Sequence, residues 1–234
     1  MKILKSEQYI NEKLNIKPVS KDRLDSFKES EVDDKTRRFI EDNNLVWNPL
    51  TKCYDCDNDV KISKDIVLDG KLKIRFGHVK GNFGCFDIKL TTLEGVPQKV
   101  GGNFDCSSNE LTTLEYAPQE IGGDFYCSHN ELTTLEGAPN EVGSGFDCSS
   151  NKLTNLKGSP QKVGSYFDCS SNKLTTLEGA PQEVEDYFDC DFNKLTNFKG
   201  APQTVGSDLY CRYNQKLVLP KTKPSWIKGE LITK

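Results

Sequence analysis

Hydrophobic and polar positions recur every 21 residues along most of the chain. One unit reads V-G-x-x-F-x-C-S-x-N-x-L-T-x-L-x-G-x-P-x-x. Within F-x-C, Phe and Cys point to one side and the residue between them to the other, which predicts a short strand with one buried face. The two leucines turn inward again, and the fixed proline disfavours a helix because it removes a backbone donor and fixes φ.

A unit this short cannot bury enough apolar surface to fold alone, whereas stacked units share their apolar faces and their strand hydrogen bonds. The pattern therefore predicts a repeat solenoid with parallel, in-register strands. The recurring Asn is predicted to lie inside the turn, where its amide bonds free backbone groups and ties neighbouring coils together.

Glycines follow the Val or Ile of most units, and we expect tight turns with φ above zero there. Glu185 takes this place in one unit, where we expect a different turn. The members of this glycine column are Gly101, Gly122, Gly143, Gly164 and Gly206.

A cysteine holds the same inward strand position in every unit. We interpret it as a small, buried, apolar side chain. The ~4.8 Å separation of stacked strands would permit a disulfide by distance, but in-register side chains point in parallel, so we expect free thiols. The column comprises Cys85, Cys106, Cys127, Cys148, Cys169, Cys190 and Cys211.

The run F-x-C-S-x-N-x-L-T-x-L resembles the leucine-rich repeat, whose pattern is L-x-x-L-x-L-x-x-N-x-L. Phe104, Cys106, Asn109 and Leu111 fill its last four positions. The L-T-x-L-x-G-x-P tail resembles the short, Pro-containing subtype found in bacterial effectors and in bacteriophage proteins. This resemblance implies a right-handed solenoid, with a parallel β-sheet on the concave face and extended or polyproline-like segments on the convex face. It implies no particular target, because the family is defined by architecture.

The two ends depart from the repeat, as terminal coils must cover the core. We expect an N-terminal helical cap or leader over residues 1–58, with helices through KDRLDSFKES and DDKTRRFIEDNN, and we leave open whether it docks elsewhere. The leucine-rich-repeat solenoid spans 59–220, beginning with a degenerate coil in which Val60 and Ile62 replace Phe and Cys. A C-terminal cap spans 221–234, where Trp226, Ile227 and Leu231 close the core.

Composition narrows the function classes. A net charge of −4 and a pI of about 5.4 disfavour a nucleic-acid partner. The chain has no ~20-residue apolar run that would span a membrane and no secretory signal. We therefore expect a cytoplasmic protein of a bacterial or phage-infected cell, with a virion-associated location left open.

Few residues suggest chemistry. Cys53 and Cys56 form a C-x-x-C pair, which admits zinc binding, redox activity or plain cap packing; we favour packing, because two further ligands at suitable spacing are absent. Ser128, His129 and Asp147 could be assembled into a triad only on paper, and no phosphate-binding loop or nucleophile elbow appears. We expect no enzymatic activity, no cofactor and no metal, and calcium is disfavoured because the acids come one to a coil.

The outward positions of the predicted sheet are more informative. They combine stacked aspartates, whose like charges repel at strand spacing, with Tyr, Ser and Asn, as in antibody paratopes. We predict a protein-interaction module that binds a basic protein partner of unknown identity through its concave face. The alternatives are a structural or virion-associated bacteriophage protein, with self-association, and an effector-like inhibitor of a host protein. The predicted binding residues are Asp105, Asp124, Tyr126, Asp147, Tyr166, Asp168, Tyr187, Asp189, Asp208, Tyr210 and Arg212.

Overall fold

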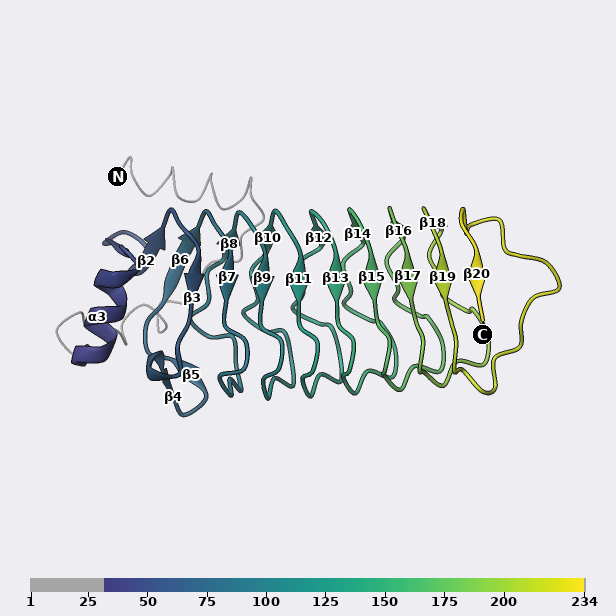
Figure 1. Cartoon of the computed structure of the whole chain (residues 1–234), viewed down its shortest axis with the longest axis horizontal. Helices are drawn as coiled ribbons and strands as arrows, with labels where there is room; N and C mark the ends of the chain where they lie inside the picture. The colour runs from purple at the N-terminus through teal and green to yellow at the C-terminus, as the bar shows by residue number, and fades with distance from the viewer. Residues whose placement is uncertain (1–31, 234) are drawn as a thin grey trace, which may run out of the picture. The chain divides into compact units, whose positions relative to one another are not determined.

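The computed structural model describes residues 32–233 (Figure 1). The chain divides into two compact units, Met1–Asp33 and Asp34–Lys234, and the second is a solenoid of stacked coils. The first predicted cap helix, through KDRLDSFKES, lies outside the described residues. The second is present as α3 (Asp34–Asp42), with Phe39 buried on its inner side.

Within the described residues, nine parallel strands form one sheet that runs the length of the solenoid (Figure 1). Each coil supplies one strand, and Phe pairs with Phe in register from coil to coil. The predicted parallel-sheet solenoid is thereby confirmed. The strands of this long sheet are β3 (Val60–Lys61), β7 (Phe83–Gly84), β9 (Phe104–Asp105), β11 (Phe125–Tyr126), β13 (Phe146–Asp147), β15 (Phe167–Asp168), β17 (Phe188–Asp189), β19 (Leu209–Tyr210) and β20 (Leu231–Ile232).

A second ladder, which the repeat pattern did not predict, runs along another side of each coil. It comprises a five-stranded and a four-stranded sheet, and it forms where the residue pair ending in Val or Ile precedes the glycine column. Its strands are β1 (Val46–Asn48), β2 (Cys53–Cys56), β6 (Phe76–Val79), β8 (Lys99–Val100) and β10 (Glu120–Ile121), then β12 (Glu141–Val142), β14 (Lys162–Val163), β16 (Glu183–Val184) and β18 (Thr204–Val205). A short 3₁₀ turn, η2 (Lys64–Ile66), and the hairpin of β4 (Val67–Leu68) with β5 (Lys71–Leu72) complete the first coils.

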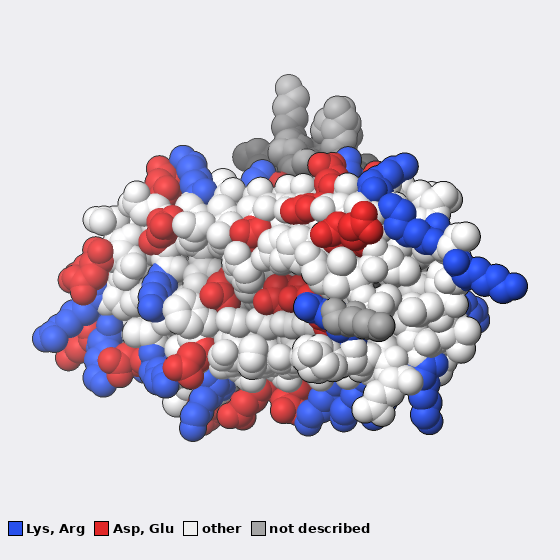
Figure 2. Space-filling model, turned by 45° about the vertical axis from the view of Figure 1, so that its right-hand side comes forward, with Lys and Arg blue, Asp and Glu red and all other residues white. Residues whose placement is uncertain are grey.

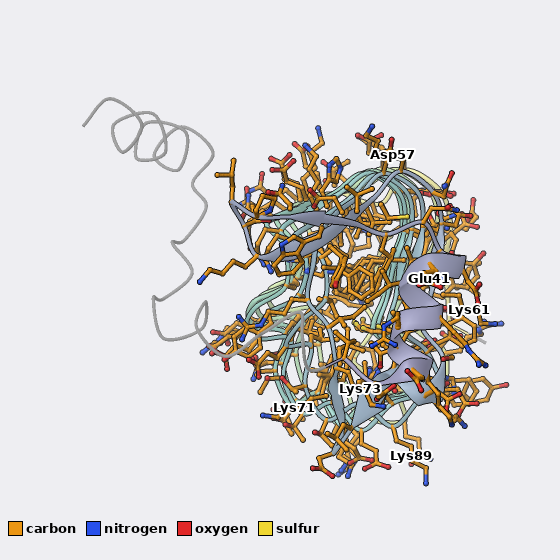
Figure 3. All side chains as sticks on the ribbon, turned by 90° about the vertical axis from the view of Figure 1, so that its left-hand side faces the viewer. Glu41, Asp57, Lys61, Lys71, Lys73 and Lys89 are labelled. Carbon is orange, nitrogen blue, oxygen red and sulfur yellow. The ribbon has the colours of Figure 1, made fainter. Side chains whose placement is uncertain are left out.

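The core is a set of columns that run along the stacking axis. Phe83 to Phe188 form one column in which consecutive ring centroids lie 5.1 to 6.0 Å apart, and every ring is fully buried. The cysteine and leucine columns lie beside it. Viewed along the stack, the coils superpose, and charged side chains such as Asp57, Lys71 and Lys89 point outward (Figure 3). Each coil therefore buries its apolar face only by contact with its two neighbours.

The buried Asn column ties the coils together as predicted. Asn130 donates to the carbonyl oxygens of Cys106 at 3.0 Å and Cys127 at 3.2 Å, which belong to two successive coils. Its Oδ1 accepts the N–H of Leu111 at 3.0 Å. The same pattern recurs at Asn151, Asn172, Asn193 and Asn214. The amide thus satisfies backbone groups that are buried away from water.

The prediction for the glycine column was wrong. Positive φ occurs instead at the glycine of L-x-G-x-P, as at Gly137 (φ 98°) and Gly179 (φ 91°). Gly122 has no positive φ, but a Cβ there would overlap the carbonyl oxygen of Gly101 in the preceding coil. These glycines are required for close stacking rather than for turning. Glu185 keeps the ladder, since its N–H donates to the carbonyl of Val163 at 3.2 Å.

The ends follow the degenerate coils expected from the sequence. Val60 pairs with Phe83, and Val60 and Ile62 are buried. Near the C-terminus, Ile227 is buried and forms a parallel bridge with Val205, while β20 pairs with β19. The Trp226 ring contacts Phe198 edge-on, with centroids 6.0 Å apart.

Candidate functional site

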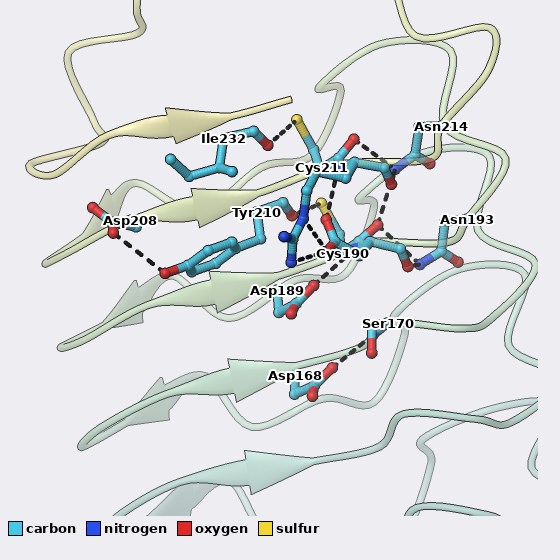
Figure 4. A network of polar contacts seen from close by, with 12 residues as sticks. Asp168, Ser170, Asp189, Cys190, Asn193, Asp208, Tyr210, Cys211, Asn214 and Ile232 are labelled. Atoms are coloured by element: carbon cyan, nitrogen blue, oxygen red, sulfur yellow. Dashed lines mark hydrogen bonds and ion pairs between the residues drawn. The ribbon is translucent and has the colours of Figure 1, made fainter. Parts of the chain in front are cut away.

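Three aspartates form an acidic column on the outward side of the long sheet, which is the face predicted to be concave. Asp147, Asp168 and Asp189 are register partners in β13, β15 and β17, one per coil. Figure 4 shows Asp168 and Asp189 on the same side of neighbouring strands. The structure therefore brings together the three carboxylates that the sequence predicted to stack.

Each carboxylate also stabilises the end of its own strand. Oδ1 of Asp147 accepts the N–H of Ser149 at 2.9 Å, and Asp189 accepts that of Asp191 at 2.8 Å. Asp168 accepts the N–H of Ser170 at 2.8 Å. The second oxygens of Asp147 and Asp189 have no hydrogen bond or ion pair within the part of the chain that the structure describes. One oxygen of each carboxylate thus supports the fold, and the other faces the surface.

The electrostatics of this column favour a cation. Burial raises the pKa of Asp189 to about 7, against the lowering effect of the Asp191 N–H, and the neighbouring charges of Asp168 and Asp191 raise it further. Burial likewise raises the pKa of Asp168. A carboxylate pKa rises in this way when the charged form is desolvated without sufficient compensation. A positively charged group placed against the column would supply that compensation.

A tyrosine row, Tyr166, Tyr187 and Tyr210, runs beside the acidic column. The rings of Tyr166 and Tyr187 stack with centroids 5.1 Å apart, and Tyr187 meets Tyr210 edge-on at 5.9 Å. Burial first, and then the charge of Asp168, raise the pKa of Tyr187 to about 12. The tyrosines therefore present aromatic surface next to the carboxylates.

The first ring of the row reaches back over the preceding coil. Tyr166 occupies the space above Gly145, where a Cβ would overlap its ring, and its hydroxyl shares a hydrogen bond with Tyr126. Tyr126 in turn donates to Oδ2 of Asp124 at 2.9 Å. This network holds the tyrosine row in one arrangement.

Several of the predicted site residues turn out to bind the molecule's own backbone. Oδ1 of Asp124 accepts the N–H of Gly145 at 2.7 Å in the next coil, and Oδ1 of Asp208 accepts that of Glu230 at 2.7 Å. Asp105 is occupied by the N–H and hydroxyl of Ser107. These acids act as struts, so the acidic column and the tyrosine row are what remains for a partner.

Arg212 has an intramolecular partner that the sequence prediction missed. Its Nη2 and Nε lie 2.6 and 2.7 Å from Oδ2 of Asp191, whose side chain is only 3% exposed. The guanidinium carbon also lies 5.4 Å from the centroid of the Tyr210 ring. The signal was present in the sequence, since Asp191 and Arg212 replace serines at positions 21 residues apart.

A second candidate surface lies on the other ladder. A groove of about 720 Å³ crosses the glycine column at Gly101, Gly122 and Gly143. Its charged rim is internally compensated, since Lys99 pairs with Glu120 at 2.6 Å. This groove offers neither an uncompensated charge nor an aromatic ring, and we favour the long sheet.

The C-x-x-C pair lies in β2. Cys53 Sγ donates to the carbonyl of Thr51 at 3.4 Å, and Cys56 Sγ to that of Asn43 at 3.5 Å. Across residues 32–233, no cluster of three or more His, Cys, Asp or Glu side chains is arranged to hold a metal.

The charge distribution agrees with this choice of site. Figure 2 shows carboxylate side chains inside the face seen in that view, whereas most Lys and Arg side chains lie around its rim. Comparisons with known proteins found no matching family model, curated protein or solved structure. No helix in the described part of the chain has the length and apolarity to cross a membrane.

Proposed function

We propose that this chain is a non-enzymatic protein-interaction module of the leucine-rich-repeat type, and that the outward side of its long sheet binds a basic protein surface. The observation that carries the proposal is the acidic column. Two of its three carboxylates keep an oxygen without a partner, and tyrosine rings lie beside them.

The surface suits recognition because little of it must be ordered on binding. Asp147, Asp168 and Asp189 are each fixed by a backbone hydrogen bond, and Tyr166 is fixed by Tyr126. A preformed surface loses less side-chain entropy when a partner docks. Tyrosines add contact area at low entropic cost, as they do in antibody paratopes.

The leucine-rich-repeat assignment rests on the repeat unit and its inner contacts. Phe, Cys and Leu occupy buried columns, and the Asn amide bonds two successive coils. These are the roles that the family pattern requires of its strand and ladder positions.

The test is a paired capture from cell lysate at low salt. The test variant is Asp147→Asn/Asp168→Asn/Asp189→Asn, because Asn keeps the Oδ1 acceptor that each strand end needs while removing the charge. The matched control is Glu120→Gln/Glu141→Gln/Glu183→Gln, which removes the same charge from the other ladder. We expect a stoichiometric protein bound by the wild type and the Gln control, lost from the Asn variant, and released by salt.

Equal capture by all three proteins would refute the acidic column as the binding site. If no protein is captured and the wild type self-associates in sedimentation experiments at micromolar concentration, the structural interpretation replaces this one. Circular dichroism of each variant establishes that the solenoid is intact before the comparison is made.

A further inference from the structure

The last regular coil carries its own cation on the long sheet. The Arg212 guanidinium lies between the Asp191 carboxylate and the Tyr210 ring, with two short contacts to Oδ2 and 5.4 Å to the ring centroid. Charge pairing and a cation–π contact act together in this arrangement. The structure thus displays, within one chain, how this face holds a guanidinium group.

The same two elements recur in the preceding coils without a cation. Tyr187 lies beside Asp168, whose charge is the largest electrostatic influence on its hydroxyl. Tyr166 stands in the same relation, one coil earlier, to Asp147. The column that supplies Asp191 and Arg212 in the last coils has only Ser149 and Ser170 here, so small side chains leave room above the sheet.

We propose that this part of the face binds arginine side chains of an extended segment in the partner, each placed between a carboxylate of the acidic column and a ring of the tyrosine row. This inference rests on the proposed function and specifies the partner's chemistry. Arginine is favoured over lysine because its planar guanidinium stacks on aromatic rings and offers several donors in a fixed fork. A lysine ammonium pairs with the carboxylates but gains less from the rings.

The spacing of the coils specifies the ligand further. Stacked strands lie ~4.8 Å apart, so Asp147 and Asp189 are separated by ~9.6 Å along the axis. Three residues of polyproline II helix span ~9.3 Å and return a side chain to the same side. A segment with two arginines three positions apart, Arg-x-x-Arg, therefore matches the two ends of the acidic column.

The test uses the full chain and four short blocked peptides, PRPPRP, PKPPKP, PRPRP and PKPKP, titrated at low salt by calorimetry. We expect PRPPRP to bind the wild type about tenfold more tightly than PKPPKP, in line with the ~1 kcal/mol or more of a cation–π contact. PRPRP should bind more weakly than PRPPRP because its arginines cannot reach both ends of the column. The Glu120→Gln/Glu141→Gln/Glu183→Gln control should behave as the wild type.

Two variants separate the contributions of ring and charge. Tyr166→Leu/Tyr187→Leu should bring the arginine peptide down to the affinity of the lysine peptide, whereas Tyr166→Phe/Tyr187→Phe should retain the preference for arginine. Equal binding of PRPPRP and PKPPKP to the wild type would overturn the arginine assignment and leave the proposed basic partner standing. Binding of neither peptide would also overturn it, and the lysate capture would then decide the proposed function separately.

Discussion

The side-chain Nδ2 of Asn151 donates a 3.0 Å hydrogen bond to the carbonyl oxygen of Cys127, which belongs to the preceding coil. The same group reaches the carbonyl of Cys148 in its own coil at 3.1 Å, and Oδ1 accepts the N–H of Leu132 at 3.0 Å. One buried amide thus satisfies backbone groups of two coils. The stability of the stack depends on this arrangement, repeated along the axis.

Asn151→Ala should therefore destabilise the protein by about 2–4 kcal/mol, because several buried backbone groups lose their partner and each costs ~1–3 kcal/mol. Chemical denaturation followed by circular dichroism measures the change. Lys173→Ala, which removes an exposed side chain two coils' width from any ladder contact of its own, is the control and should change stability by less than ~0.5 kcal/mol. A similar small change at Asn151 would contradict the role of the amide ladder.

The cysteine column should be unreactive in the native state. Burial raises the pKa of Cys106, Cys148 and Cys169 far above its ordinary value, and their side chains are fully buried. Cys53 is the most accessible of the nine thiols, although burial raises its pKa as well. Titration with a thiol reagent at pH 8 should label Cys53 first and the column only on unfolding. Cys53→Ser should abolish the early reaction, and rapid labelling of further thiols in that variant would show that the column opens.

Stability should depend on pH through Asp189. Its pKa of about 7 in the folded protein lies above the ~3.9 of an aspartate in an unfolded chain, so the folded state holds the extra proton between these values. Stability from this group is therefore greatest at acidic pH and is lost as pH rises from about 4 to about 7. Asp189→Asn keeps the acceptor for Asp191 and should be more stable than the wild type at pH 8, with the difference vanishing near pH 4. Thermal unfolding of both proteins from pH 4 to pH 8 tests this, and parallel curves would contradict it.

The glycine of L-x-G-x-P should tolerate no side chain. Gly137 has a φ of 98°, and a Cβ there would overlap the carbonyl of Leu114, so Gly137→Ala should cost about 2 kcal/mol or more. Tyr116 occupies the equivalent position with a φ of 75°. Tyr116→Gly should relieve backbone strain of ~1 kcal/mol, offset by any contacts that its ring makes. Denaturation midpoints should thus fall sharply for the first variant and change little or rise for the second.

The sequence predicted the features that depend on side-chain periodicity. The alternation in F-x-C located the strands of the long sheet, and the constant Asn predicted the amide ladder correctly. The stacked aspartates followed directly, because an in-register parallel sheet places residues 21 apart beside each other. These features are local and repeat without interruption.

Features that depend on contacts between coils were missed. Gly122 was assigned to a turn, although its role is to admit the carbonyl of Gly101, a distance that no single unit reveals. Asp124 was counted as a binding residue, yet it accepts the N–H of Gly145. A polar side chain on a repeat surface has the same sequence signature whether it bonds the next coil or solvent, so only the three-dimensional stack separates these roles.

The hydrogen bonds that join one coil to the next run along the stacking axis, as between Cys127 N–H and the carbonyl of Asp147 at 2.8 Å. A pulling force applied to the two ends of the solenoid would therefore load these bonds along their own direction and open them one coil at a time, rather than shearing many together. Each opened coil would release 21 residues. That length corresponds to about 70 Å of extended chain. Under tension, the molecule should lengthen in equal steps at modest force, behaving as an extensible link rather than as a rigid rod.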